Sequence, residues 1–580
     1  MFARQTTSSF NKARFAPSAT LALVCGLASF AAAGDCPGAG TILTEQRISN
    51  TSGGFGGTIA ADSFFGRAAV AIGDVDGDGV TDLAIGSYGD ADGGLARGAV
   101  WIVFMNADGT VKGQQKISST TGGLVGPPNN NAGFGYAIAP LGDMDNDGVP
   151  DIAVGAYREN DGGANRGAVY IIRLNANGTV KSQQKISSTQ GGFTGPLLNA
   201  DWFGTGVAAI GDLDGDGIID IAVGTELDKD GGTNRGAVYI LMLNANGTVK
   251  AEQKISSTQG GLTGPLLDND RFGNAVAGIG DIDGDGIPDI IVGAYRDSDG
   301  GTARGAAYVL MLNADGTVKD EQKISSTQGG LTGPIANTDW FGSSVAAIGD
   351  IDGDGVVDIA VGAQQNDDGG MNHGAVYVLR MNSDGTVKSE QRLSSTTGGL
   401  TGPLAVGDVF GSAVGAIGDF DGDGIPDLIV GAMQADDGAT DAGAVFLLTL
   451  DGCESSGSGP VVITTQPASL ISGPAPSAVQ FSVVAEGAPT ISYQWRRDTV
   501  PLSNGGGISG ATTATLTVTA NSAAIGVYDC VVTNSFGSET SDGAILAVRP
   551  WPCLADLNQD GNLDFFDVQI FLQAFAAGCP

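Results

Sequence analysis

The chain has 580 residues, which is too many for one ordinary hydrophobic core. Its formal net charge is −36, from 64 acidic and 28 basic residues. Because nucleic acid is bound largely through Lys and Arg on phosphates, this acidic composition excludes a nucleic-acid-binding protein.

Residues 1–33 predict an export signal. Arg4, Lys12 and Arg14 precede an apolar run from Ala19, which ends in three alanines before Gly34. A basic start, a short apolar core and a small-residue cleavage site are typical of a secretory signal. That core is too short to cross a bilayer, and we expect no transmembrane segment later in the chain. The prediction is a secreted protein, located outside the cell or at its surface.

Removal of the signal leaves five cysteines, which in an exported protein are expected to pair as disulfides. Cys36 and Cys453 flank the central region, Cys553 and Cys579 flank the last segment, and Cys530 is left over. We expect disulfides among the first four, although sequence alone does not determine the connectivity.

Between residues 34 and 453 the chain repeats one unit of 69 residues six times. Each unit opens with Phe-Gly, as at Phe65, and continues through an Ala/Val-rich strand, an acidic loop and two apolar strands. Those two strands are nearly continuous in Ile, Val and Ala, as expected when both faces of a sheet are buried. An Asn-Ala-Asp-Gly type of turn leads into a fourth strand. Four short antiparallel strands per repeat predict a propeller blade, and hence an all-β, six-bladed propeller.

The fourth-strand motif occurs once before the first Phe-Gly unit, and the last unit lacks it. We therefore expect residues 41–49 to complete the last blade and to close the ring without an open edge. A Cys36–Cys453 disulfide would then link the N-terminal strand covalently to the end of the last repeat. An open stack of repeats would instead leave an unpaired edge at each end.

A nine-residue acidic loop recurs in every unit, with carboxylates at positions 1, 3, 5 and 9 and Gly at position 6. Alternate residues of a tight loop point to one centre, where four carboxylates repel one another unless a cation binds there. Oxygen ligands in that number suit Ca²⁺ better than Mg²⁺, which demands strict octahedral geometry. The predicted metal site residues, with loop position 7 included, are Asp74, Asp76, Asp78, Val80, Asp82, Asp143, Asp145, Asp147, Val149, Asp151, Asp212, Asp214, Asp216, Ile218, Asp220, Asp281, Asp283, Asp285, Ile287, Asp289, Asp350, Asp352, Asp354, Val356, Asp358, Asp419, Asp421, Asp423, Ile425 and Asp427.

The Phe-Gly openings, the Asp-x-Asp-Gly-Asp-Gly-x-x-Asp loops and the Gly-Ala-Tyr turns over residues 41–452 resemble the FG-GAP repeats of integrin α-subunit propellers and their bacterial relatives. The resemblance implies Ca²⁺ in the hairpin loops, on the face away from the usual ligand-binding surface. Integrin propellers have seven blades and this chain has six copies, so integrin ligand specificity is not expected to carry over.

Residues 454–459 have the composition of a flexible linker, and residues 460–548 alternate Val, Thr and Ser as in a sandwich. Tyr493-Gln-Trp495 and Tyr528-Asp-Cys530 resemble strands C and F of an immunoglobulin-like domain, with Tyr528 as the tyrosine corner. Val483 takes the place of the partner cysteine. Cys530 is therefore expected to be a buried free thiol.

Residues 553–580 resemble one half of a dockerin, with an EF-hand-like loop followed by an apolar helix from Phe565 to Phe575. The resemblance implies one further Ca²⁺ and a cohesin-like or cell-wall anchor partner, although a full dockerin has two such loops. The predicted ligands are Asp556, Asn558, Asp560, Asn562, Asp564 and Asp567.

A second acidic string follows each Gly-Ala-Tyr turn and makes either solvated turns or a further cation or ligand site. Turns are favoured, because Asp in Asp-Gly-Gly groups initiates them through its own side chain. A candidate partner for these acids is the Arg beside the third strand, at Arg97, Arg166, Arg235 and Arg304. The acids are Asp90, Asp92, Glu159, Asp161, Asp228, Asp230, Asp297, Asp299, Asp368 and Asp437.

No catalytic site is predicted. His373 is the only histidine and stands where other repeats carry Arg or Ala. Paired carboxylates fit glycoside hydrolysis by residue type, but nearly every acid belongs to the repeated pattern. Trp202 and Trp340 precede two Phe-Gly openings, and they either stack on a sugar or pack between blades.

The predicted function is non-enzymatic: a secreted, calcium-binding propeller for adhesion to, or recognition of, an extracellular protein or glycan. The rival hypothesis is a carbohydrate-binding or carbohydrate-active component that a dockerin-like tail attaches to a polysaccharide-degrading assembly.

Overall fold

The computed structural model describes residues 40–451, 461–472, 477–486, 491–534 and 537–548. The predicted export signal, the linker, the EF-hand-like tail with its six ligands, and Cys36, Cys453, Cys553 and Cys579 lie outside these residues.

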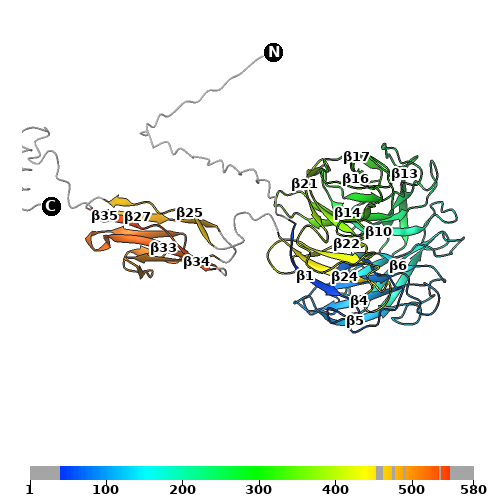
Figure 1. The fold of residues 1–580 in the computed structure, drawn as a ribbon, viewed down its shortest axis with the longest axis horizontal. Coiled ribbons are helices and arrows are strands. Elements are labelled where there is room, and N and C mark those ends of the chain that lie inside the picture. The colour runs from blue at the N-terminus through cyan, green and yellow to red at the C-terminus, as the bar shows by residue number, and fades with distance from the viewer. Residues whose placement is uncertain (1–39, 452–460, 473–476, 487–490, 535–536, 549–580) are drawn as a thin grey trace, which may run out of the picture. The chain divides into compact units, whose positions relative to one another are not determined.

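Residues 40–451 form six four-stranded antiparallel sheets, one for each repeat (Figure 1). Together they fit the predicted propeller, and in each sheet the strand that follows Phe-Gly is the innermost. The first three sheets contain β2 (Phe65–Gly73), β3 (Asp82–Ser87), β4 (Ala99–Met105) and β5 (Val111–Ile117); β6 (Phe134–Gly142), β7 (Asp151–Ala156), β8 (Ala168–Leu174) and β9 (Val180–Ile186); and β10 (Phe203–Gly211), β11 (Asp220–Thr225), β12 (Ala237–Leu243) and β13 (Val249–Ser256). The other three contain β14 (Ala275–Gly280), β15 (Asp289–Ala294), β16 (Ala306–Leu312) and β17 (Val318–Ile324); β18 (Phe341–Gly349), β19 (Asp358–Ala363), β20 (Ala375–Met381) and β21 (Val387–Leu393); and β22 (Phe410–Gly418), β23 (Asp427–Ala432), β24 (Ala444–Leu450) and β1 (Ile42–Ile48).

Burial along the strands follows their composition. Every residue of the second strands, such as β7, is buried, and the third strands, such as β12, are buried almost throughout. The fourth strands, such as β17, are buried at their apolar ends and exposed or half-buried at the polar residues between them. The turn before the fourth strand closes as expected: the amide of Asn106 donates to the carbonyl of Thr110, and Gly109 has φ +79°.

Strand β1 is the fourth strand of the last sheet, where it pairs antiparallel with β24 from Ile42 opposite Leu450 to Ile48 opposite Val445. The N-terminal strand and the last repeat thus form one sheet, in the arrangement that the displaced fourth-strand motif predicts.

Adjacent sheets are held together by six apolar layers, each built from two repeats. One layer joins the third repeat to the fourth through Val238, Ile240, Phe272 and Tyr308, among others. Another joins the last repeat to the first through residues such as Val445 and Phe65. The Phe of every Phe-Gly opening is fully buried in these layers, and a typical one, Phe272, packs edge-on against Tyr308 with ring centroids 5.5 Å apart.

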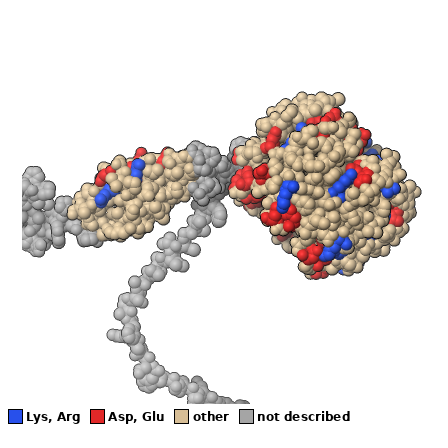
Figure 2. Space-filling view, turned by 90° about the horizontal axis from the view of Figure 1, so that it is seen from below, with Lys and Arg blue, Asp and Glu red and all other residues tan. Residues whose placement is uncertain are grey.

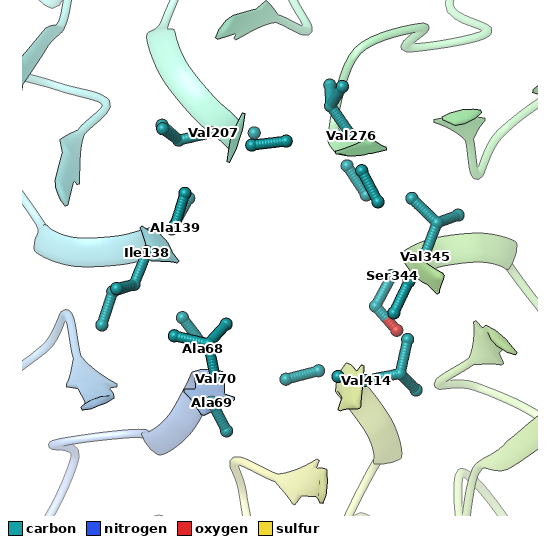
Figure 3. Close-up of a pocket in the computed structure, with 18 of the residues that line it drawn as sticks. Ala68, Ala69, Val70, Ile138, Ala139, Val207, Val276, Ser344, Val345 and Val414 are labelled. Carbon is teal, nitrogen blue, oxygen red and sulfur yellow. The ribbon is translucent and has the colours of Figure 1, made fainter. Parts of the chain in front are cut away.

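The six innermost strands surround a central cavity of about 270 Å³ (Figure 3). Its walls carry small apolar side chains, including Ala68, Val70, Val207, Val276 and Val414. The cavity is therefore an apolar channel between the sheets.

The second described part is an immunoglobulin-like sandwich. Its elements are β25 (Val462–Thr465), β26 (Leu470–Ser472), β27 (Ser477–Ser482), β28 (Val484–Glu486), β29 (Ser492–Arg497), β30 (Val500–Pro501), β31 (Ile508–Ser509), β32 (Thr515–Ala520), the 3₁₀ turn η1 (Ser522–Ala524), β33 (Gly526–Asn534), β34 (Gly537–Thr540) and β35 (Ala544–Val548). Trp495 is fully buried, and the hydroxyl of Tyr528 donates to the carbonyl of Ala524 at 2.7 Å, which confirms the tyrosine corner. Cys530 is a buried free thiol beside buried Val483, also as predicted.

Candidate cation-binding loops

The acidic loops connect the first strand of each sheet to the second. In the first loop one oxygen of Asp74, Oδ1, accepts the amides of Gly77 and Asp78 at 2.7 and 3.0 Å, and its Oδ2 accepts the amide of Gly79 at 2.7 Å. Gly77 and Gly79 have φ values of +80° and +90°, which favour glycine. The second loop carries Asn146 at loop position 4 with φ +58°, a conformation that Asn tolerates. The carboxylate at position 1 thus fixes the loop backbone.

The carboxylate at position 9 ties the loop to the sheet. Asp82 Oδ2 accepts the amide of Val75 at 2.9 Å, and its Oδ1 accepts the amide of Met105 at the end of β4, also at 2.9 Å. The same pair of bonds recurs at Asp151, Asp220, Asp289, Asp358 and Asp427. Burial raises the pKa of Asp151, Asp220, Asp289 and Asp427 to about 6 and that of Asp358 to about 7. Position 9 therefore has a structural role beside any role as a ligand.

The predicted carboxylates do come together. Oxygens of Asp74, Asp76 and Asp82 lie within 4.8 Å of one another, and positions 1, 3 and 9 cluster likewise in the second, third and fifth loops. In the fourth loop the cluster consists of Asp281, Asp283 and Asp285. The amide of each position-7 residue donates to the carboxylate at position 5, as from Val80 to Asp78 at 2.8 Å.

Five loops also contain a lysine that the sequence analysis did not identify. Lys112 at the start of β5 contacts Asp76 and Asp78 through Nζ at 2.7 and 2.6 Å. The equivalent residues are Lys181, Lys250, Lys319 and Lys388. Figure 2 shows the result, acidic clusters with a basic side chain beside them. The hydrogen bond from Lys112 lowers the pKa of Asp78.

The sixth loop has no such lysine, because β1 supplies Leu43 at this register. Leu43 is exposed. Burial, with the neighbouring carboxylates of Asp421 and Asp419, raises the pKa of Asp423. The last loop therefore concentrates negative charge without a basic side chain from the described residues beside it.

The loops fit a hard divalent cation even where lysine is present. In the first and fifth loops lysine contacts Oδ2 of Asp76 and Asp352, whereas Oδ1 of each is buried and has no hydrogen-bond partner in the described part of the chain. A buried carboxylate oxygen without a partner is costly, and a bound cation would satisfy it. At position 1 of the first loop, Asp74 Oδ1 accepts two amides, whereas Oδ2 accepts one and keeps a second lone pair.

The second acidic string forms turns, as the favoured interpretation holds. Asp90 Oδ1 accepts the amide of Asp92 at 2.9 Å, and Lys116 of β5 contacts Asp90 Oδ2 at 2.8 Å. The prediction that the arginine beside the third strand pairs with these acids is wrong. Arg97 instead donates to Asn130 at 2.9 Å, and Arg235 pairs with Asp268 at 3.0 Å, because this arginine points toward the next repeat.

His373 is part of the repeated loop structure. Its Nδ1 lies 3.0 Å from Ser395 Oγ, and that hydroxyl donates to the carbonyl of Asp368 at 2.8 Å. Ser188 and Ser326 make the same bond to the backbone in repeats without histidine. The serine therefore has a structural role that does not depend on His373.

Comparison with known families agrees with this geometry. The FG-GAP repeat family matches residues 66–103, 134–172 and 410–448, and the FG-GAP-like repeat family matches residues 212–292 and 281–361. The immunoglobulin I-set domain family matches residues 462–548.

Curated relatives include integrin α subunits. Integrin alpha pat-2 of Caenorhabditis briggsae is 31% identical over 286 residues, which are 45% of this chain and 21% of the relative. Integrin alpha-3 of Cricetulus griseus is 34% identical over 201 residues, 34% of this chain and 17% of the relative. The chain therefore spans about a fifth of the length of these relatives. Among solved structures, titin M4 is 23% identical with a TM-score of 0.15 and covers 16% of this chain and 98% of its own.

The FG-GAP repeats, the I-set domain and the integrin α relatives together support an integrin-like propeller with an additional immunoglobulin-like domain. Among the described residues, no helix is both long and apolar enough to span a bilayer.

Proposed function

We propose that this chain is an exported, calcium-stabilised recognition protein whose propeller binds an extracellular protein or glycan without catalysing a reaction. The observation that carries the proposal is the clustering of carboxylates in five of the six loops, two of which hold a buried oxygen with no hydrogen-bond partner among the described residues. The similarity to integrin α subunits supports adhesion or recognition as the role.

The proposed ring is closed. Gly443 of the last repeat forms a parallel bridge with Phe65 of the first, as Gly98 does with Phe134 between the first two repeats. The amide of Thr401 donates to Glu45 of β1 at 3.0 Å, as that of Thr263 does to Glu321. These equivalent contacts support an interface between the last and first sheets that is like the interfaces between the other adjacent sheets.

Calcium in this proposal is a structural ion. It is bound by loop positions 1, 3, 5, 7 and 9 and holds the first and second strands of each sheet together. A calcium ion in the C-terminal loop and the pairs Cys36–Cys453 and Cys553–Cys579 belong to the same proposal. Extracellular calcium modules bind with Kd on the order of 10⁻⁴–10⁻³ M, so occupancy follows the calcium level outside the cell.

The test is thermal unfolding and ligand screening of the full chain, with calcium, with magnesium and with EDTA. Calcium is expected to raise Tm well above its EDTA value and above its magnesium value, because a ligand that binds only the folded state stabilises it. Glycan arrays and panels of extracellular proteins should yield a calcium-dependent ligand. Equal melting in calcium and EDTA, or turnover of a polysaccharide, would contradict the proposal.

A further inference from the structure

The six repeats differ most from one another at one end of the central channel. The residue after Phe-Gly is Arg67, Tyr136, Thr205, Asn274, Ser343 or Ser412 in successive repeats. The residue after the second strand is Tyr88, Tyr157, Glu226, Tyr295, Gln364 or Met433. Because each inner strand runs from Phe-Gly toward its acidic loop, this end lies away from the loops. A site that uses different side chains from each repeat would be built here.

Nine of these twelve residues line a pocket of about 120 Å³, which shares Arg67, Tyr136, Asn274 and Ser343 with the channel. Its remaining lining includes Tyr88, Glu226, Tyr295 and Trp340. We call it the channel-mouth pocket.

Arginine outnumbers acid around the channel-mouth pocket. Glu226 is buried, and its Oε1 accepts from Arg271 Nη1 at 2.9 Å. Arg67 stacks on Tyr136 with its guanidinium carbon 4.0 Å from the ring centroid, and Arg296 lies 5.5 Å from the centroid of Trp340. Arg67 and Glu226 line the pocket, and Arg271 and Arg296 lie beside the lining residues Glu226 and Trp340. Three guanidinium groups are thus near one carboxylate, in a protein whose net charge is −36. The local excess of positive charge favours an anion.

Buried polar atoms at this site lack partners in the part of the chain that the structure describes. Asn274 is only 4% exposed; its Nδ2 donates to the carbonyl of Ser343 at 3.0 Å, but its Oδ1 has no donor. The Nε atoms of Arg271 and Arg296 are also buried and unpaired. Such atoms are uncommon, because each costs the desolvation of the group.

We infer that the channel-mouth pocket binds the carboxylate-bearing end residue of an acidic saccharide; this names the ligand class of the proposed recognition function and rests on that function. The guanidinium groups bind the sugar carboxylate. Asn274 Oδ1 accepts from a sugar hydroxyl, and the ring of Trp340 packs against the C–H face of the sugar.

A sugar acid matches this pocket better than an acidic peptide. The carboxylate of an Asp or Glu side chain would satisfy the arginines, but that side chain offers no donor for Asn274 Oδ1 and no flat face for Trp340. A neutral sugar supplies donors and a flat face, but it leaves the positive charge unmatched. Only a ligand with all three features satisfies every group.

The experiment compares binding of trigalacturonic acid and of its methyl ester to the full chain by calorimetry at constant calcium. The acid is expected to bind about tenfold or more tightly than the ester, the difference expected for a charge-assisted contact. Arg67→Gln should lower affinity for the acid by about tenfold, and Gln364→Glu, a nearly isosteric change at the pocket wall, should do so by repulsion. Arg97→Gln is the matched control away from the pocket and should leave affinity unchanged.

Equal binding of acid and ester, binding of hexaglutamate in preference to the sugar acid, or unchanged affinity in a folded Gln364→Glu variant would overturn the inference. If another ligand from the glycan or protein screen still binds in those cases, the recognition function stands and only the saccharide assignment fails. If no extracellular ligand binds the wild-type chain, the proposed function itself fails.

Discussion

At the scale of single residues, five lysines and one leucine divide the six loops into two kinds. Lys181 contacts Asp145 and Asp147 at 2.8 and 2.5 Å, so an internal cation offsets part of the loop charge. Leu43 leaves the sixth loop without this offset. If calcium binds the loops as proposed, the sixth loop depends most on that ion for its stability.

Leu43→Lys is expected to raise the Tm of the chain in EDTA by more than it does in saturating calcium. The new ammonium group would reach Asp421 and Asp423, as Lys112 reaches the corresponding acids of the first loop. Leu43 is exposed, so its replacement leaves the core intact. Thermal unfolding in both conditions measures the effect, with Leu43→Gln as the uncharged control. An equal Tm change for the two variants would contradict the charge argument.

A second prediction at this scale concerns Asp270, which is buried with its Oδ2 2.6 Å from the amide of Leu267. Burial, with a smaller contribution from Asp297, raises the pKa of Asp270 to about 6, against weaker opposition from the amide of Leu267 and from Lys323 and Arg235. The folded state therefore binds more protons than the unfolded state above the ordinary pKa of 3.8. Stability from this residue falls as pH rises toward 6.

Asp270→Asn keeps the amide acceptor and removes the charge. The variant should be more stable than the wild type at pH 7, by up to about 3 kcal/mol, and lose this advantage near pH 4. Urea unfolding at the two pH values, at fixed calcium, measures the difference. A pH-independent difference would show that the buried charge is not the cause.

At the scale of elements, glycine lets neighbouring sheets approach. A Cβ at Gly224 in β11 would overlap the carbonyl oxygen of Gly273, which belongs to the next Phe-Gly opening. Gly431 in the last repeat stands in the same relation to Gly66 in the first. The close approach explains why the second strand carries glycine among Ile, Val and Ala.

Gly224→Ala is expected to destabilise the chain by about 3 kcal/mol, because the backbone oxygen of the facing sheet has no room to move. Gly113→Ala in β5 is the matched control, since its Cβ would make only an ordinary contact of 3.6 Å with Phe104. Chemical denaturation of both variants tests the prediction. Equal stability of the two variants would contradict the steric argument.

The positions of the strands and loops could be predicted from sequence, but the contacts between them could not. The buried strands and the acidic loops have short contiguous sequence patterns, such as Asp-Ile-Ala-Val at Asp151, so sequence alone located them. The pairing of Lys112 with Asp76 was missed, because it depends on the register of β5 against a loop 36 residues earlier. A lysine at one constant position in five repeats was the available signal.

The residues of the channel-mouth pocket were missed because they do not repeat. Arg67, Asn274 and Glu226 belong to no motif, since each differs from its counterparts in the other repeats. A position-by-position comparison of the six copies would have found them, because divergence within a regular repeat marks a place where symmetry is not required. Trp340 was noticed, but its neighbours Tyr295 and Arg296 come from an earlier segment of the chain.

At the scale of the whole molecule, β1 completes the last sheet across about 400 residues of sequence. A chain that lacks residues 40–49 would expose the edge of β24 and part of two apolar layers. We expect this truncated chain to self-associate more than the control does, and a peptide of residues 40–49 to reverse that association. Light scattering after gel filtration measures the outcome, with a chain that begins at residue 38 as control. A monomeric truncated chain of unchanged Tm would contradict the closed ring.

The place of β1 also orders events during biosynthesis. The ribosome makes this strand first, yet its partner β24 ends at Leu450, so β1 waits unpaired while five sheets are completed. A nascent chain arrested anywhere before that residue carries β1 as an unpaired strand, which can associate with other chains. Factors that bind unfolded chains would have to protect this strand until synthesis passes Leu450.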